Sequence, residues 1–384
     1  MPRLYHTKSK TGCKRCRARR VKCDESRPTC GSCRRHKVEC TYDREESGNA
    51  THANGASGQN HSPSITESRE RRRRELELLH FFTVQTTRTL SSTHVPELLE
   101  TWSVDVPRLA LSYDPLLDAI MAFSSHHMAR IAKTQEKRED YLTLRSLYLE
   151  STLHKHRQAV GDLSRENADA VSFTTVILTI DAFANLRERQ LEPYEPPIQW
   201  IQISRGVGSV CKLALDLIKD DDDAKILPLI DTMMPFIGVY HSKRKQNIAL
   251  FARLLVPQDG ETVDADDMQA YETTASLLGW ILAGHKSGEH LKMYCRRLTT
   301  FPVLLPDRFI TLLERQDPRA LVLLAHFFAL ASHAAEFWWI GEVPCREICA
   351  IQGHLSPGWQ GMAAECVQAV QAHAPGRAEQ GLPQ

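Results

Sequence analysis

Signatures of the common enzyme classes are missing from this sequence. It contains no H-E-x-x-H, no G-x-S-x-G and no P-loop, and His126 and His127 are adjacent rather than four residues apart. The GVGSVC stretch at residues 206–211 lacks the third glycine of a dinucleotide fingerprint and has no strand before it. These absences predict a protein without enzymatic activity.

Uninterrupted apolar runs are also scarce. The most apolar stretch, residues 320–341, is interrupted by His326, His333 and Glu336, which favours a buried helix over a membrane span. The first residues, MPRLYHTKSKTG, lack the apolar segment of an export signal. We therefore expect reduced cysteines rather than disulfides.

Apolar side chains are almost absent from residues 13–40, which read CKRCRARRVKCDESRPTCGSCRRHKVEC. Apart from cysteine, the aliphatic residues are Ala18, Val21 and Val38, and we expect the two valines, at equal offsets from their cysteines, to pack inward. So short a segment cannot bury enough apolar surface to offset its chain entropy. Because six of the chain's eleven cysteines lie here, bound metal is the interaction that we expect to hold it together.

The six cysteines form one unit, C-x2-C-x6-C, written twice. Thiolates in C-x2-C pairs are typical of tetrahedral zinc, but each unit supplies one ligand too few for a closed site. Two ions must therefore share two thiolates, and the pseudo-symmetry of the units assigns the shared positions to Cys13 and Cys30. A single four-cysteine zinc ribbon is the alternative, and it would leave two matched cysteines without a role. The predicted ligands of two Zn2+ ions are Cys13, Cys16, Cys23, Cys30, Cys33 and Cys40.

Positive charge is concentrated around these cysteines. Residues 1–44 carry a formal charge of +10, whereas the rest of the chain carries −9, so the net charge of +1 hides a strongly basic module. Such a concentration of positive charge indicates a polyanion partner. Lysines and arginines between Cys13 and Cys23 are not offset by any acid, whereas Glu39 accompanies those of the second unit. We expect the first unit to enter the major groove of DNA and the second to contact mainly phosphates.

Arginine side chains are suited to reading guanine, because one guanidinium donates to both O6 and N7. The alternative for Arg17, Arg19 and Lys22 is contact with phosphate alone, which positions a protein without specifying a sequence. The predicted DNA-binding residues are Arg17, Arg19, Arg20, Lys22, Arg34, Arg35 and Lys37.

All six cysteine positions resemble the fungal binuclear zinc-cluster DNA-binding domain, and Pro28 matches a proline usual between its two halves. The resemblance covers about a tenth of the chain. It implies a nuclear, sequence-specific regulator of RNA polymerase II transcription that binds a CG-containing duplex motif. In this family the basic residue four positions after the second cysteine contacts the bases, and that position is Arg20.

Composition changes after the cysteine-rich segment. We predict a DNA-binding domain over residues 1–44, a disordered linker over residues 45–68 that is rich in Gly, Ser, Asn and Thr, and an all-α regulatory domain over residues 69–384. The leucines at residues 76–90 make a poor coiled-coil zipper, which predicts monomeric DNA binding or weak dimerisation. The run Arg71–Arg74 is interpreted either as a nuclear localisation signal or as a solvated helix face.

Helical periodicity continues nearly to the end of the chain, and prolines punctuate it. An acidic run at residues 219–225, KDDDDAK, is expected to be a loop between helices. No convincing run of alternating strand pattern occurs. The fold class predicted is a small zinc-stabilised N-terminal module joined by a flexible linker to a mainly-α regulatory domain. The predicted helices cover residues 116–131, 138–160, 168–186, 198–218, 267–284, 305–315 and 318–340.

The helical region also resembles the regulatory domain of fungal sterol-uptake-control regulators, which is shared by many regulators of biosynthetic gene clusters. The stretches that carry this likeness begin ELELLHFF at residue 75, ETWSVDVP at residue 100 and ALVLLAHFF at residue 320. The resemblance implies a lipid- or sterol-responsive domain that acts on the transcription machinery. It leaves two target sets open, a secondary-metabolite gene cluster or genes of sterol uptake and synthesis.

Two other functions remain as alternatives. The zinc module could belong to an adaptor that binds RNA or protein, although residues 13–40 contain no aromatic residue on which RNA bases could stack. The helical region could be an enzyme targeted to DNA, which the absence of catalytic motifs disfavours. The sequence therefore predicts a fungal transcription factor of the zinc-cluster type.

Overall fold

The chain divides into two compact units, Met1–Thr66 and Glu67–Gln384. The predicted linker lies outside the described residues except for Ser68, and the predicted domain boundaries stay predictions. Side chains are described throughout except at residues 234–236 and 371–372. The computed structural model describes residues 12–26, 28–42, 68–91, 93–232, 234–258 and 261–372.

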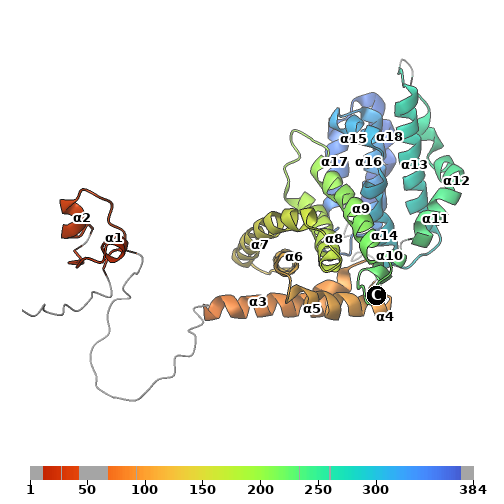
Figure 1. Ribbon diagram of the computed structural model, residues 1–384. Helices are drawn as coiled ribbons and strands as arrows, with labels where there is room; N and C mark the ends of the chain where they lie inside the picture. The colour runs from red at the N-terminus through yellow and green to blue at the C-terminus, as the bar shows by residue number, and fades with distance from the viewer. Residues whose placement is uncertain are drawn as a thin grey trace, which may run out of the picture. The chain divides into compact units, whose positions relative to one another are not determined.

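The first unit contains two short helices, α1 (Lys14–Ala18) and α2 (Gly31–Arg35). Both surround a cluster of buried cysteines, against which Val38 and Tyr42 pack. The red part of the ribbon in Figure 1 shows these two helices joined by an extended loop. A helix of five residues is too short to be stable by itself, so its form depends on what the cysteines bind.

The second unit is helical, and no strand occurs among its described residues. The predicted fold class, a cysteine-centred module followed by a mainly-α region, is confirmed. The helical elements are α3 (Arg69–Phe81), η1 (Phe82–Thr86), η2 (Thr87–Thr89), α4 (Pro96–Glu100), η3 (Thr101–Asp105), α5 (Val106–Ala110), α6 (Asp114–Ile131), α7 (Gln135–Gly161), α8 (Ala168–Ala184), η4 (Asn185–Glu188), α9 (Ile198–Ile218), α10 (Leu227–Asp231), α11 (Met234–Ser242), α12 (Arg244–Ala249), η5 (Ala252–Leu255), α13 (Ala265–Lys286), α14 (Leu291–Leu304), α15 (Asp307–Glu314), α16 (Pro318–Ala331), η6 (Ser332–Ala334), α17 (Val343–His354) and α18 (Pro357–Ala372).

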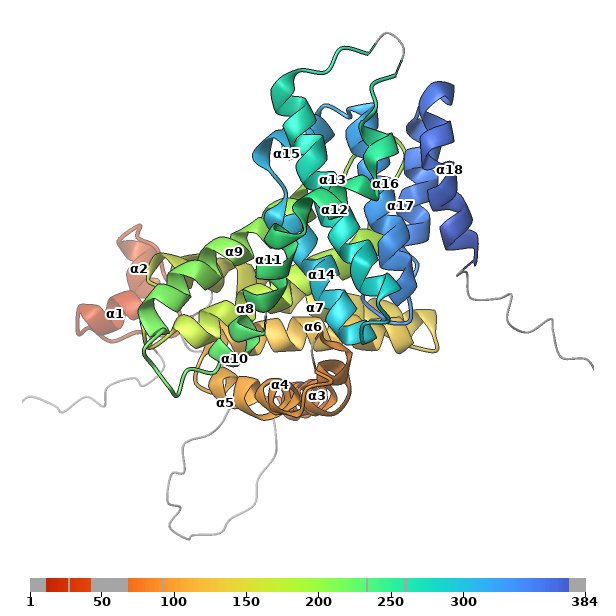
Figure 2. The same ribbon diagram turned by 90° about the vertical axis from the view of Figure 1, so that its right-hand side faces the viewer.

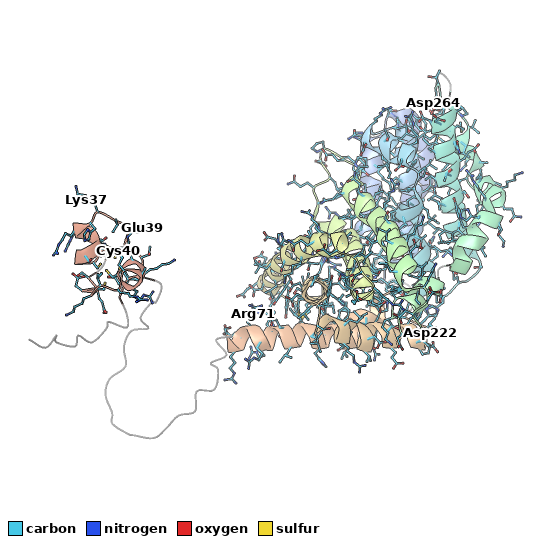
Figure 3. All side chains as sticks on the ribbon, in the orientation of Figure 1. Lys37, Glu39, Cys40, Arg71, Asp222 and Asp264 are labelled. Carbon is cyan, nitrogen blue, oxygen red and sulfur yellow. The ribbon has the colours of Figure 1, made fainter. Side chains whose placement is uncertain are left out.

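One helix prediction was wrong at its end, and one helix was not predicted. The predicted helix 318–340 ends at Ala331 and continues only as the short turn η6. Further turns follow, and Gly341, within the range 335–342, has a φ of +47° in the left-handed region. Residues 291–304 form α14, which was not predicted, and Pro302 lies inside that helix rather than at a break. The acidic run does form the loop after α9, where Asp222 is marked in Figure 3.

The core of the second unit is centred on α16. Every residue from Arg319 to Ala331 is buried, and α16 packs against α13, α17 and α18. A second layer is formed by α6, α7 and α8, with α9 packed along α8 and α14 (Figures 1 and 2). The segment Ala168–Glu188 is long and apolar enough to span a membrane, but 78% of its most apolar window is buried within the unit, as in a core helix.

The aromatic residues of α16 and of the segment after it fill the core. Phe327, Phe328 and Trp339 are almost fully buried. The indole nitrogens of Trp338 and Trp339 donate to the hydroxyl and the carbonyl oxygen of Thr89, at 3.0 and 3.1 Å. These contacts attach the end of the chain's most apolar stretch to η2, some 250 residues earlier in the sequence.

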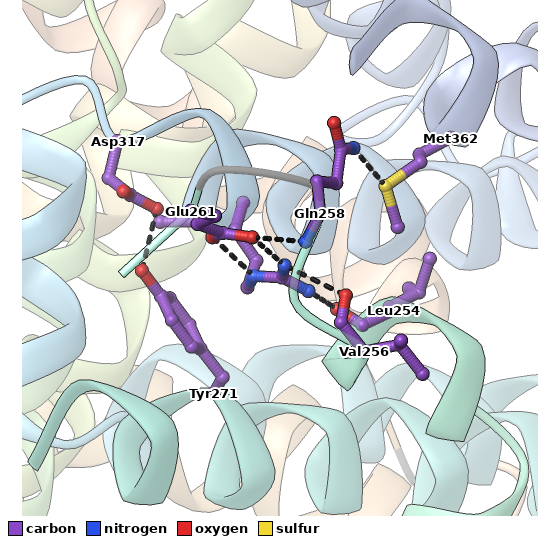
Figure 4. Close-up of polar contacts among 9 residues, drawn as sticks. Leu254, Val256, Gln258, Glu261, Tyr271, Asp317 and Met362 are labelled. Atoms are coloured by element: carbon purple, nitrogen blue, oxygen red, sulfur yellow. Dashed lines mark hydrogen bonds and ion pairs between the residues drawn. The ribbon is translucent and has the colours of Figure 1, made fainter. Parts of the chain in front are cut away.

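Arg319 is a fully buried cation that joins a loop to the core. Its guanidinium donates to the carboxylate of Glu261 and to the carbonyl oxygens of Leu254 and Val256, the last at 3.0 Å. Figure 4 shows these acceptors around the guanidinium. Because a buried charge is costly unless it is paired, this contact holds the loop between η5 and α13 in place.

Asp181 on α8 is the second buried ionic centre. Its carboxylate accepts from His126 Nδ1 at 2.7 Å and from Arg145 Nε at 3.0 Å, which links α6, α7 and α8. The adjacent His127 instead contacts Thr86 through Nδ1 at 3.0 Å and stacks on Trp338. The two histidines have different hydrogen-bond partners, both rings contact Trp338, and both serve packing, as the sequence indicated.

Three buried histidines make stability depend on pH. Burial lowers the pKa of His127 to about 3 and the pKa values of His156 and His326 to about 4. In the unfolded chain a histidine titrates near 6.5, so between pH 6.5 and 4 the unfolded state binds more protons than the folded state. Stability must then fall as pH falls through this window.

We expect the free energy of unfolding to be lower at pH 5 than at pH 7, and His156→Gln to reduce that loss by about 2 kcal/mol. Glutamine keeps a partner for Thr175, whose hydroxyl is 3.0 Å from His156 Nε2, but does not titrate. Urea unfolding followed by tryptophan fluorescence measures this, because all six tryptophans lie in the second unit. The exposed His80→Gln is the control, and an equal pH dependence in all three proteins would contradict the assignment.

Candidate metal centre and nucleic-acid interface

Each short helix of the first unit begins at a cysteine. The sulfur of Cys13 accepts from the backbone N–H of Cys16, and the sulfur of Cys30 accepts from that of Cys33, both at 3.4 Å. A sulfur in the N-cap position satisfies a donor that the helix leaves unpaired. The C-x2-C spacing therefore sets the first turn of each helix and brings its two sulfurs to one side.

The third cysteine of each unit closes the loop after its helix. Cys23 Sγ accepts from the N–H of Cys13 at 3.4 Å, and Cys40 Sγ accepts from the N–H of Cys30 at 3.3 Å. The two sequence repeats thus make the same backbone-to-sulfur hydrogen bonds. The repeat seen in the sequence is therefore also a repeat in the structure.

The six sulfurs gather into two overlapping sets of four. Within each set all sulfurs lie within 4.8 Å of one another, and Cys13 and Cys30 belong to both. The Sγ–Sγ distances are 3.8 Å for Cys13–Cys30, 3.6 Å for Cys13–Cys33 and 3.6 Å for Cys16–Cys30. Tetrahedral zinc with Zn–S bonds of about 2.3 Å places sulfurs about 3.8 Å apart, so the spacing fits two ions. The sets are Cys13, Cys16, Cys23, Cys30 and Cys13, Cys30, Cys33, Cys40.

Residues outside the cysteine pattern complete this centre. The carboxylate of Asp24 accepts from the N–H of Gly31 at 3.0 Å, and this bond lowers the pKa of Asp24. A side chain at Gly31 would place its Cβ 2.4 Å from Asp24 Oδ2, so the Asp24 carboxylate would have to move away from this position. Tyr42 donates from its hydroxyl to Ser26 O at 3.1 Å and lies 3.7 Å from Cys23 Sγ. Sequence reasoning missed Asp24 and Tyr42, because neither belongs to a spacing pattern.

The basic side chains lie on the outside of the first unit. All of the residues predicted to bind DNA are exposed, as are Lys14 and Arg15. Arg20 and Lys37 occupy equivalent places after the two helices, and both have left-handed backbones, with φ of +55° and +49°. Figure 3 shows Lys37 and Glu39 together on the second half, where an acid offsets the basic charge. Cysteine fills the interior of this unit, so its lysines and arginines remain on the surface.

The two valines are not equivalent, and the expectation that both pack inward was wrong for one. Val38 packs against the cysteine cluster, whereas Val21 is 45% exposed. The sequence offset of both is the same, so the difference arises from the folding of the chain around the cluster.

Comparison with known proteins identifies the family. Residues 11–49 match the fungal Zn(2)-Cys(6) binuclear cluster domain. The chain is 37% identical over 332 residues to the Zn(2)-C6 fungal-type transcription factor afumD of Aspergillus fumigatus, which covers 85% of this chain and 86% of that protein. The chain belongs to the Zn(2)-C6 fungal-type transcription factors. Its Zn(2)-Cys(6) module binds two zinc ions, and the protein is a DNA-binding transcription regulator of a family that is generally nuclear.

Two further relatives extend this comparison. A Zn(2)-C6 fungal-type transcription factor of Gibberella zeae is 24% identical over 429 residues, covering 93% of this chain and 84% of that protein. Sterol uptake control protein 2 of Candida albicans is 42% identical over 269 residues, which is 67% of this chain and 36% of that protein. The resemblance to both groups was expected from the sequence.

The second unit of this Zn(2)-C6 protein contains a pocket of about 400 Å3 between α8, α9, α10 and α14. We call it the α9–α14 pocket. Aliphatic side chains such as Val176, Ile180 and Val303 form most of its wall. At one edge α9 approaches α14 so closely that a Cβ at Gly208 would lie 2.8 Å from Val303 Cγ1. Gly208 of GVGSVC therefore serves helix packing, whereas a Cβ at Gly206 would meet nothing within 4 Å.

We expect metal analysis of the purified full-length protein to give two zinc ions per chain. Cys13→Ser and Cys30→Ser should each lose both ions, because each sulfur belongs to both sets, whereas Cys16→Ser should retain close to one. Cys345→Ser, which changes an exposed thiol on α17, is the control and should retain two. A wild-type content of one ion, or one ion retained after Cys13→Ser, would contradict the shared positions.

Proposed function

We propose that the protein recognises a CG-containing duplex motif through the first half of its zinc module. The observation that carries this proposal is the uninterrupted basic surface between Cys13 and Cys23, where every lysine and arginine is exposed and no acid intervenes. The two zinc ions hold this short segment rigid without a conventional core, and Cys13 and Cys30 bridge them. The seven predicted contact residues are distributed over both halves.

The two halves of the zinc module make different contacts with DNA. Arg20, at the end of α1, supports base contact, because arginine donates to guanine in two bonds and its left-handed backbone ends the helix there. Arg34, Arg35 and Lys37 in the second half are accompanied by Glu39, which weakens the local potential. These residues contact phosphates and orient the module on the duplex.

We expect Arg20→Ala to weaken binding of the preferred duplex by about 1–3 kcal/mol and to broaden base preference at one or two positions. Arg35→Ala should weaken binding of preferred and scrambled duplexes alike and lower the salt slope by about one. Selection from random duplexes with full-length protein, followed by titration at several salt concentrations, measures both effects.

Arg20→Lys serves as the matched control, because lysine keeps the charge but not the two-bond geometry. It should retain affinity for scrambled duplexes and lose base preference, with the zinc content unchanged. A change in specificity caused by Arg35→Ala and not by Arg20→Ala would reverse the assignment of the halves. A preference for random RNA over random duplex DNA would support the adaptor function instead.

The helical unit then acts on the transcription machinery, and the target genes form a biosynthetic cluster of secondary metabolism. The likeness to afumD along most of both chains supports a shared kind of role. The alternative is a sterol-responsive regulator of sterol uptake or synthesis genes. It is supported by the 42% identity to a sterol uptake control protein and by the apolar α9–α14 pocket.

The two target sets predict different maps of genomic occupancy. For a cluster regulator we expect the full-length protein to bind promoters of contiguous biosynthetic genes, with occupancy independent of sterol supply. Chromatin immunoprecipitation from cells grown with and without a sterol-synthesis inhibitor measures this. Occupancy at dispersed sterol genes that changes with the inhibitor would favour the alternative. An Arg20→Ala strain is the control, since it should lose peaks in either case.

A further inference from the structure

The first half of the zinc module carries its aliphatic side chains on the outside. Ala18 and Val21 are both exposed, and Val21 is 45% exposed. In the second half Val38 packs against the cysteine cluster together with Tyr42. The half with the unopposed basic residues therefore also presents apolar carbon to water, which is an unfavourable environment for it.

The local backbone holds Val21 in a defined place. Its N–H donates to the carbonyl oxygen of Cys16 at 3.1 Å, and the N–H of Val38 donates to that of Cys33 at 3.2 Å. Each valine also follows a residue with a left-handed backbone, which is Arg20 in the first half. Because these features are equivalent in the two halves, Val21 is as firmly positioned as Val38 but points to a surface that nothing in its own unit covers.

The neighbours of Val21 indicate what can cover this surface. Arg19, Arg20 and Lys22 are all exposed beside it in the sequence, and no acid occurs between the first and third cysteines. Such a concentration of positive charge attracts a polyanion, and this family binds DNA. A duplex that approaches Arg20 also approaches Val21, because one peptide bond joins the two residues.

The spacing of the chain matches the spacing of the bases. Consecutive Cα atoms lie about 3.8 Å apart, and successive base pairs of B-DNA lie about 3.4 Å apart. Neighbouring residues in the major groove can therefore face neighbouring base pairs. Phosphates and the polar atoms of base edges offer no favourable contact to an isopropyl side chain. The apolar group that the groove exposes is the C5-methyl of thymine, and 5-methylcytosine has the same group at the same position.

We propose that Val21 contacts a pyrimidine C5-methyl group in the base pair next to the guanine that Arg20 contacts. The inference rests on the proposed function, because it requires the first half of the module to enter the major groove. It adds a second specificity-determining residue of different chemistry. Arg20 selects guanine by donating two hydrogen bonds, whereas Val21 selects a methyl-bearing pyrimidine by removing apolar surface from water.

Replacements in the DNA test this contact with the full-length protein and its zinc bound. Uracil lacks only the C5-methyl group of thymine, and 5-methylcytosine adds only that group to cytosine. At the pair next to the guanine identified by Arg20→Ala, we expect uracil for thymine to weaken binding about fourfold, or 5-methylcytosine for cytosine to strengthen it about fourfold. This is the effect of burying one methyl-sized group.

The two kinds of replacement distinguish the source of the methyl group. An effect of uracil assigns thymine, and an effect of 5-methylcytosine assigns the methylated base. Both results support the contact, and they need no protein variant, so they do not depend on how a substitution affects zinc binding. Unchanged affinity after every replacement at that pair would overturn the proposal.

Variants of the protein then assign the methyl effect to Val21. Val21→Ser removes both methyl groups from an exposed side chain, so it should keep two zinc ions and bind duplexes with and without the C5-methyl equally well. Val21→Ile keeps a branched apolar side chain and should retain the preference. Val38→Ala is the matched control from the second half and should also retain it. A methyl effect that persists in Val21→Ser, or that disappears in Val38→Ala with two zinc ions bound, would refute the assignment.

The same titrations separate this inference from the proposed function. If Arg20→Ala broadens base preference while no C5-methyl group affects binding, the first half reads DNA without Val21, and only this inference fails. If Arg35→Ala changes specificity and Arg20→Ala does not, the second half reads the bases, and the proposed function fails together with the contact of Val21.

Discussion

Six thiolates shared between two zinc ions are the constraint on which the DNA-binding half of this protein depends. Cysteine supplies nearly all of the buried side chains of the first unit, and its two helices have five residues each. Neither feature would persist in a chain without metal. Because the interior is committed to sulfur, lysine and arginine occupy the surface, and a basic face results without a separate structural element.

The helical unit is held by a different balance, in which a large apolar core accommodates a few paired charges. Arg319 is paired with Glu261, and Asp181 is paired with His126 and Arg145. Each pair joins segments that are distant in sequence. Removing one partner would leave a buried charge unpaired and would lower the free energy of unfolding.

The division of the chain also divides the function. The zinc module presents basic side chains that can contact DNA, whereas the helical unit contains a large apolar core and a mostly apolar pocket. Residues that resemble enzyme signatures have structural roles instead. His126 Nδ1 hydrogen-bonds to the carboxylate of Asp181, and Gly208 allows α9 to approach α14.

Spacing and periodicity were sufficient to predict the two-zinc module, the mainly-α class and the limits of helices such as α9, because these features depend on neighbours in the sequence. Tertiary structure alone decided that Val21 is exposed while Val38 packs against the cluster, that α16 ends at Ala331, and that α14 continues through Pro302. It also decided that Arg296 faces a pocket shared with α8, α9 and α10. These outcomes depend on contacts between segments distant in the chain, and a local pattern contains no information about which segments will meet.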